Sequence, residues 1–252
     1  MLKNVLIFCA VSLMSVGCGK NYRGNGGGGG GNYAGQAQGV YSGLSSNGYT
    51  YSTIVLPSDK FYAIYGSLSG NTLLLFGLVT GQGSSGNGTY TASVTDFFIS
   101  GAPNSGSVNA TYVAGSGLNG TLTENATTTT FTGNAEPASS FTYNTAASLS
   151  AITGSWTGTL LDGMNTTVTI NSDGSLTGSS SGCSLSGTVA PDSSNKNFFD
   201  VSLTFGPSPC STPNLNVTGV AVEYLLSDGV THQLLAGATA GTFFATVFAA
   251  TR

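Results

Sequence analysis

The sequence predicts an all-β protein made of two tandem small antiparallel barrels, each of about eight strands. Charged residues make up only 6% of the 252 residues, so the strong helix formers Lys, Glu and Arg are scarce. Short segments of alternating apolar residues favour strands, and turns rich in Gly, Asn, Asp and Pro separate them. The body of the chain also contains a similar unit twice, which indicates a tandem arrangement.

The two units span residues 39–133 and 151–252, with a linker at 134–150. The segment GVYSG at 39–43 matches GSWTG at 154–158. An up-and-down barrel suits many short strands joined by tight turns, because closure removes exposed strand edges. A sandwich is the alternative. The predicted strands of the second unit are 154–161, 165–171, 174–180, 183–190, 197–206, 214–226, 230–237 and 241–249. Those of the first are 50–56, 60–67, 71–80, 87–95, 107–113, 117–123 and 128–133.

Residues 1–17 have the pattern of a signal peptide. Lys3 supplies a positive start, and the apolar stretch from Val5 to Met14 is too short for a permanent membrane span. The run SVGC that ends at Cys18 looks like a lipobox, although Ser15 stands where leucine is commoner. The alternative is an ordinary signal peptide followed by a chance cysteine. We expect Cys18 to be the lipidated first residue of the mature protein, and the covalent lipid to be its only cofactor-like group.

Residues 18–38 are expected to form a flexible tether after that lipid. The segment contains six consecutive glycines at 26–31 and has little to bury, so it favours a coil that holds a domain away from a membrane. The resemblance to bacterial lipoproteins implies sorting to the outer membrane, because Gly19 rather than Asp follows the cysteine. The membrane is therefore the first expected partner, reached through the lipid anchor.

Cys183 and Cys210 are the two cysteines that remain once Cys9 is removed with the signal and Cys18 takes lipid. In an oxidising compartment such a pair is expected to form a disulfide. Two cysteines without a histidine partner make a poor metal site, so no metal is expected.

A single membrane-spanning barrel built from both units is a further alternative. The strands are rich in Gly, Ser and Thr and lack a continuous apolar outer band with aromatic girdles, which argues against it. The lipobox also offers another means of anchoring. Two separate barrels are the preferred prediction.

Two short motifs resemble catalytic signatures. The GxGxxG run at 81–86 is followed by a predicted strand, whereas a dinucleotide site needs a helix there. The GxSxG run around Ser180 would need His232, the only histidine, and the strand–turn–helix of an α/β sheet. Since nothing predicts that fold, we expect no catalytic residues and no enzyme activity.

Carboxylates dominate the charge of the body. All ten lie between Asp59 and Asp228, and residues 39–252 carry only three Lys or Arg residues, a net charge of −7. Such a surface does not neutralise phosphates, so nucleic acid is excluded as an expected partner. Asp59 and Asp173 occupy matching turn positions and are expected to hydrogen-bond their own turns rather than act as a catalytic pair.

Aromatic residues crowd the first unit and supply the ligand-binding candidates Tyr49, Tyr51, Phe61 and Tyr62. Strand alternation places some of these rings outward, where tyrosine makes a binding surface for an extracellular protein or glycan. The alternative is that they form cross-strand pairs and barrel plugs.

The lipobox, the glycine tether, the two GxYxG- and GxWxG-initiated units and the late Gly182-Cys183…Cys210 pair resemble a group of uncharacterised proteobacterial lipoproteins. That resemblance implies no known activity. More loosely, small eight-stranded barrels on lipid tethers resemble the surface lipoproteins that bind transferrin or complement factor H, an analogy of architecture only.

We therefore expect a non-enzymatic binding or adhesion lipoprotein at the outer membrane that faces the cell surface. One alternative is an envelope structural lipoprotein that faces the periplasm. Another is a lipocalin-like carrier, because an eight-stranded barrel is just wide enough for one small ligand. The sequence does not distinguish a filled barrel from a hollow one, and it gives no oligomeric state.

Overall fold

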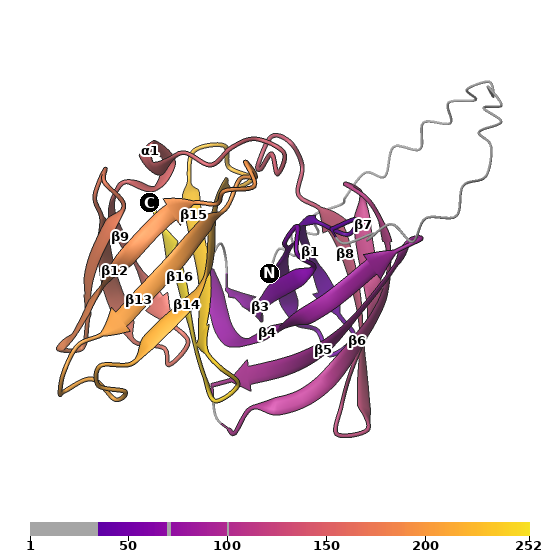
Figure 1. Cartoon of the computed structure of the whole chain (residues 1–252), viewed down its shortest axis with the longest axis horizontal. Helices are drawn as coiled ribbons and strands as arrows, with labels where there is room; N and C mark the ends of the chain where they lie inside the picture. Colours follow the sequence, from indigo (N-terminus) through magenta and orange to yellow (C-terminus); the bar gives the residue numbers. More distant parts are fainter. Residues whose placement is uncertain (1–34, 70–71, 100) are drawn as a thin grey trace, which may run out of the picture. The chain divides into compact units, whose positions relative to one another are not determined.

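A computed structural model describes residues 35–69, 72–99 and 101–252. They form two closed antiparallel barrels in tandem, as Figure 1 shows, which confirms the predicted fold class and excludes the sandwich. The predicted signal peptide, Cys18 and most of the tether lie outside these residues. Within the described ranges, no helix has the length and apolar character needed to cross a membrane.

The first barrel is an eight-stranded meander in which each strand pairs with its neighbours in sequence, and β1 pairs with β8 to close it. Its first strand is the one that the sequence did not predict as a strand. The strands are β1 (Gly39–Ser45), β2 (Thr50–Val55), β3 (Lys60–Ser69), β4 (Thr72–Gly86), β5 (Thr89–Phe98), β6 (Asn104–Val113), β7 (Gly117–Glu124) and β8 (Thr127–Ala135).

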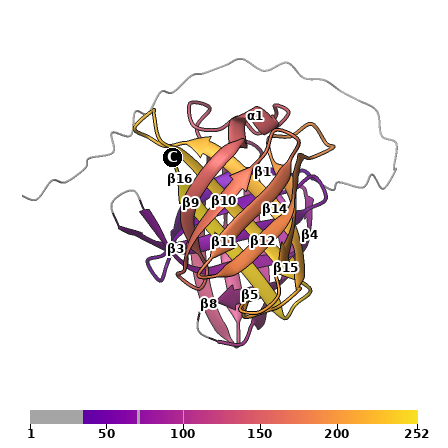
Figure 2. The ribbon, with the colours of Figure 1, turned by 90° about the vertical axis from the view of Figure 1, so that its left-hand side faces the viewer.

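The second barrel repeats this topology and closes where β16 pairs with β9 (Figure 2). All eight predicted strands are present. They are β9 (Gly154–Leu160), β10 (Asn165–Ile170), β11 (Ser175–Ser180), β12 (Cys183–Pro191), β13 (Phe199–Phe205), β14 (Asn216–Leu225), β15 (His232–Ala240) and β16 (Phe244–Thr251). The short helix α1 (Leu149–Ile152) precedes β9.

The second glycine of each repeated motif lies at the seam where its barrel closes. A Cβ at Gly43 would lie 1.8 Å from the carbonyl oxygen of Thr132 on β8. A Cβ at Gly158 would lie 2.0 Å from the carbonyl oxygen of Ala249 on β16. Only glycine permits these close backbone approaches, which explains why both motifs carry it.

The central aromatic residue of each motif is fully buried and anchors the turn just before its barrel. The Tyr41 hydroxyl donates to the carbonyl of Ala37 at 3.0 Å, and the Trp156 Nε1 donates to the carbonyl of Ile152 at 2.7 Å. Both acceptors lie four residues upstream. Residues 35–38, which the sequence assigned to the tether, therefore pack against the first barrel as α1 packs against the second.

The disulfide predicted between Cys183 and Cys210 is present and ties the start of β12 to the loop between β13 and β14. The interior of the second barrel is filled with apolar side chains, including Ile152, Trp156, Leu185 and Phe199. This barrel is thus a packed domain core.

A further apolar cluster combines outward-facing residues of both barrels with the linker. Tyr62, Ile64 and Leu78 of the first barrel are buried in it together with Val220 and Leu235 of the second. The linker contributes Phe141 to the same cluster. Tyr62 therefore faces outward from its own barrel but is covered, with only 5% of its surface exposed.

Candidate functional site: the cavity of the first barrel

The first barrel encloses a cavity of about 270 Å³, whereas the interior of the second leaves only about 50 Å³. The difference follows from the inward side chains. The interior of the first barrel includes small residues such as Thr53 and Ala63, whereas Leu, Ile and Phe side chains fill the interior of the second. The first barrel is therefore hollow and the second is filled.

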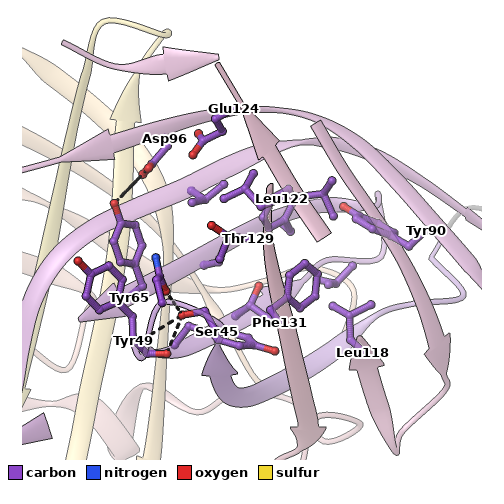
Figure 3. Close-up of a pocket in the computed structure, with 18 residues that line it drawn as sticks. Ser45, Tyr49, Tyr65, Tyr90, Asp96, Leu118, Leu122, Glu124, Thr129 and Phe131 are labelled. Atoms are coloured by element: carbon purple, nitrogen blue, oxygen red, sulfur yellow. Dashed lines mark hydrogen bonds between the residues drawn. The ribbon is translucent and has the colours of Figure 1, made fainter. Parts of the chain in front are cut away.

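The wall of the cavity is mostly apolar, and its side chains come from most strands of the barrel (Figure 3). Inward tyrosines fit because inward glycines face them. A Cβ at Gly77 would lie 2.4 Å from the Tyr65 ring, and one at Gly133 would lie 2.3 Å from the Tyr51 hydroxyl. The apolar lining residues are Val55, Phe61, Ala63, Val79, Val108, Leu118, Leu122 and Phe131.

A buried polar network closes one end of the barrel, which we call the floor. The Asp59 carboxylate, 2% exposed, accepts hydrogen bonds from the backbone N–H of Ser85 at 3.0 Å and from its hydroxyl at 2.7 Å. The Ser85 Oγ in turn accepts from the N–H groups of Gln36 and Ala37. The Tyr90 hydroxyl donates to the carbonyl of Asp59 at 2.7 Å. Residues 36–37 are thereby fixed across the floor.

This network corrects the expected role of Asp59. Its carboxylate bonds Ser85 on β4 rather than its own turn, because Asp59 is buried at the barrel end, where a polar group needs donors from the protein. Asp173 behaves as expected, since it is exposed and accepts from the N–H and hydroxyl of Ser175 within its own turn.

The opposite end, which we call the mouth, is polar and acidic. Asp96 on β5 and Glu124 on β7 both line it, and Figure 3 shows their carboxyl groups on the same side of the cavity. The Tyr65 hydroxyl donates to both carboxylate oxygens of Asp96, at 3.0 and 3.1 Å. The exposed Asn47 and the partly exposed Thr129 also line this end, so the cavity reaches the surface here.

Aromatic rings form one side of the mouth. The Tyr49 ring stacks on the Tyr65 ring with their centroids 5.9 Å apart. Tyr49 also contacts Phe76 edge to face at 5.2 Å. The mouth thus presents π-faces beside two carboxyl groups.

Burial makes both carboxyl groups at the mouth weaker acids than usual. Desolvation raises the pKa of Asp96 to about 6, although the hydrogen bond from Tyr65 opposes the shift. Desolvation, with repulsion from Asp96, raises the pKa of Glu124 to about 7. Near neutral pH the mouth therefore holds between one and two negative charges.

Three polar atoms that line the cavity have no hydrogen-bond partner within the described part of the chain. They are the Tyr51 hydroxyl, the Thr53 Oγ1 and the Glu124 Oε1. Tyr51 is 7% exposed and Thr53 is 4% exposed. Buried polar groups are nearly always paired in folded proteins, so these atoms are free to bind a molecule in the cavity.

The structure brings together three of the four candidate residues. Tyr49, Tyr51 and Phe61 line the cavity, whereas Tyr62 faces the opposite way and lies in the cluster between the barrels. Tyr65, Asp96 and Glu124 also line the cavity but are not among the residues predicted from the sequence. Strand alternation could have identified the two carboxylates. Side chains two residues apart on a strand point to the same face, so a carboxylate two residues from an inward apolar residue also points into the barrel.

The two catalytic-like motifs lack the structural context that they would need. Residues 81–86 are the end of strand β4, which turns directly into β5. Ser180 is buried on β11, while His232 begins β15, which is not a neighbour of β11, and contacts Glu223 instead. No group of three or more potential metal ligands occurs among the residues that the structure describes.

Comparison with known proteins finds no matching family model and no matching curated protein. Among solved structures, a protein of unknown function from the DUF3598 family of Nostoc punctiforme matches with 12% identity and a TM-score of 0.27, over 88% of this chain and 96% of that one. Transferrin binding protein B matches with TM-scores of 0.26, at 7% identity for serogroup B Neisseria meningitidis and 8% for Haemophilus parasuis. These two matches cover 81% of this chain but only 65% of theirs. The function therefore has to be argued from the cavity itself.

Proposed function

We propose that this chain is an exported, non-enzymatic binding protein whose first barrel holds one small, mostly apolar ligand. The observation that carries the proposal is the hollow interior of that barrel, sealed at the floor and open at the mouth. The second barrel supplies a filled partner domain. Lipid attachment at Cys18 and location at the outer membrane are part of the same proposal and rest on the sequence alone.

The size of the cavity limits the ligand. Pockets for drug-sized molecules span roughly 300–1,000 Å³, and 270 Å³ lies just below that range. A single ring or a short alkyl chain with one polar group suits such a space. Small ligands gain at most about 1.5 kcal/mol per non-hydrogen atom, so micromolar binding, about 8 kcal/mol, is within reach.

Calorimetric titration of the full chain with benzyl alcohol, 2-phenylethanol and 1-octanol tests this proposal. We expect at least one of these neutral probes to bind with one molecule per chain. Ala63→Phe places a ring in the cavity and should abolish binding, because Ala63 lines its wall. Ala190→Phe, on an exposed position of the second barrel, is the matched control and should bind like the unmodified chain.

Binding of none of these alcohols, or equal binding by Ala63→Phe, would contradict a ligand site inside the first barrel. Loss of binding in Ala190→Phe as well would also count against it, since that position does not line the cavity. Circular dichroism of both variants checks that each barrel remains folded.

Adhesion to a protein or glycan is a second candidate, and a specific observation favours it. Leu68, Leu74 and Ile99 are exposed by 59%, 49% and 51%, and they lie at the mouth end of the first barrel. Contiguous exposed apolar patches mark interaction surfaces, and these three side chains lie at one end of the barrel. Protease treatment of intact cells, followed by an antibody to the second barrel, tests whether this end meets an outside partner. Loss of signal supports adhesion, and protection until the outer membrane is opened contradicts it.

A further inference from the structure

We infer that the first barrel selects small amphiphilic organic cations, with an amine head between Asp96 and Glu124 and an apolar body inside the cavity. This inference deepens the proposed function and rests on it. It names the chemical class of the ligand, which neither the fold nor the comparisons supply.

The charge at the mouth is unbalanced. Asp96 and Glu124 both line the cavity, whereas no Lys, Arg or His does so among the residues that the structure describes. The three Lys and Arg side chains in the described ranges lie over aromatic rings elsewhere. Lys60 lies over Tyr62, Lys196 over Tyr143 and Arg252 over Trp156. A ligand cation would supply the counter-charge that the protein does not.

The two acidic groups at the mouth have oxygen atoms available to accept further hydrogen bonds. Tyr65 holds the Asp96 carboxylate with one bifurcated hydrogen bond, which leaves lone pairs on both oxygens for a further donor. Glu124 Oε1 is buried and has no hydrogen-bond partner in the ranges that the structure describes. An ammonium group has three donors and no acceptor, so it matches this set of acceptors.

The aromatic side of the mouth favours a cation as well. The stacked rings of Tyr49 and Tyr65, with Phe76 beside them, adjoin the Asp96 carboxylate. A cation within about 6 Å of such a ring is attracted to its face. An anionic head would instead be repelled by both carboxylates and by the ring faces.

The interior of the barrel also favours a bound molecule, independently of charge. The Tyr51 hydroxyl and Thr53 Oγ1 are more than nine-tenths buried, line the cavity and lack a partner in the described chain. They indicate that the space is built to receive a molecule rather than to stay empty. The apolar wall around them suits the body of an amphiphile.

Protonation of the mouth supports the same ligand class. The tyrosines beside Asp96 there are Tyr65 and Tyr49. Burial, together with the charge of Asp96, raises the pKa of the Tyr65 hydroxyl, so this group stays neutral at pH 8. Asp96 and Glu124 lose their protons as pH rises past about 6 and 7. An alkylamine stays charged over this range, so its affinity should increase from pH 5.5 to pH 8.

The test compares three probes that share one body and differ in the head group. The full chain is titrated calorimetrically at pH 8 with 2-phenylethylamine, 2-phenylethanol and 3-phenylpropionate. A charge-assisted hydrogen bond predicts that the amine binds roughly tenfold or more tightly than the alcohol. The carboxylate should bind most weakly.

The variant Asp96→Asn/Glu124→Gln should lose the preference for the amine and keep the binding of 2-phenylethanol, which shows that the barrel is intact. Asp162→Asn is the matched control, because it removes an exposed carboxylate from a turn of the second barrel. It should leave all three affinities unchanged.

Equal affinities for the amine and the alcohol, or tightest binding of 3-phenylpropionate, would overturn the cation inference while leaving the small-ligand proposal standing. Failure of all three probes to bind would overturn the inference together with the proposed function. An undiminished preference for the amine in the double variant would overturn the assignment of these two residues.

Discussion

The carboxyl groups at the mouth show most directly how single residues depart from their ordinary chemistry. Burial favours the protonated form of Asp96, so the folded protein binds this proton more tightly than the unfolded chain does. The stability that this group supplies is therefore fully present below its unfolded pKa, near 4, and is lost as pH rises through about 6. Glu124 acts in the same direction, up to about pH 7.

Asp96→Asn is expected to remove part of the dependence of folding stability on pH. Calorimetric melting of the unliganded chain should show a higher melting temperature for the variant at pH 8, and a flatter profile between pH 4 and pH 7. Asp162→Asn should follow the unmodified chain. A profile of Asp96→Asn that matches the unmodified chain would mean that the carboxyl is well solvated.

Removal of the unpartnered hydroxyl of Thr53 or Tyr51 is expected to stabilise the protein. Thr53→Val keeps the shape of the side chain and removes a buried polar atom that has no partner in the described chain. We expect the empty protein to gain about 1 kcal/mol in its free energy of unfolding, measured by urea titration. Tyr51→Phe should act in the same sense. A loss of stability in both variants would show that these hydroxyls are hydrogen-bonded in the ligand-free protein.

At the scale of elements, the repeated motif sets how each barrel closes. Gly43→Ala would place a methyl group against the carbonyl of Thr132, which belongs to the pairing of β1 with β8. We expect a loss of at least about 3 kcal/mol, because the backbone cannot move away without breaking the seam. Thermal unfolding measures it, with Ser42→Ala on the outer face as the control. Equal stability of the two variants would refute the role of this glycine.

Most strands could be predicted from the sequence because turn residues and alternation mark them locally. The segments 165–171 and 183–190, for example, differ from β10 and β12 by a single residue at one end. The first strand of the chain was missed because GVYSGLS carries little alternation and follows a glycine-rich segment. Its pairing with β8, some ninety residues later, is a long-range contact that no local pattern reveals.

The candidate site was predictable only in part. Tyr49, Tyr51 and Phe61 were identified by their type, but Tyr62 was assigned with them although it is the outward neighbour of Phe61. Whether a barrel is hollow depends on the summed volume of inward side chains from all eight strands. That sum requires the register of every pair, so the difference between the two barrels became visible only in the structure.

At the scale of the whole molecule, the two barrels share a topology and differ in their interiors. The filled barrel carries the disulfide and an apolar core, and the hollow barrel carries the cavity and the acidic mouth. Under the proposed function, the hollow repeat binds the ligand and the filled repeat supplies stability. Inward glycines in the first barrel, such as Gly77 and Gly133, leave room for tyrosines at the expense of core packing.

Cys183→Ser/Cys210→Ser should separate these two roles. The bridge spans 27 residues of sequence, and its loss should cost about 3–4 kcal/mol in the chain-entropy estimate. Chemical denaturation should show the second barrel unfolding earlier. Binding of 2-phenylethylamine under native conditions should be unchanged, because neither cysteine lines the cavity. Loss of amine binding by the double variant in the absence of denaturant, where both barrels are still folded, would contradict this separation of roles.

The central claim is that the first barrel holds the ligand, and nuclear magnetic resonance of the isotope-labelled full chain tests it most directly. Titration with 2-phenylethylamine at pH 8 should shift the signals of cavity residues such as Thr53, Tyr65 and Asp96, and leave those of the second-barrel core, including Trp156, in place. Shifts confined to the second barrel, or no shifts at saturating amine, would contradict the account.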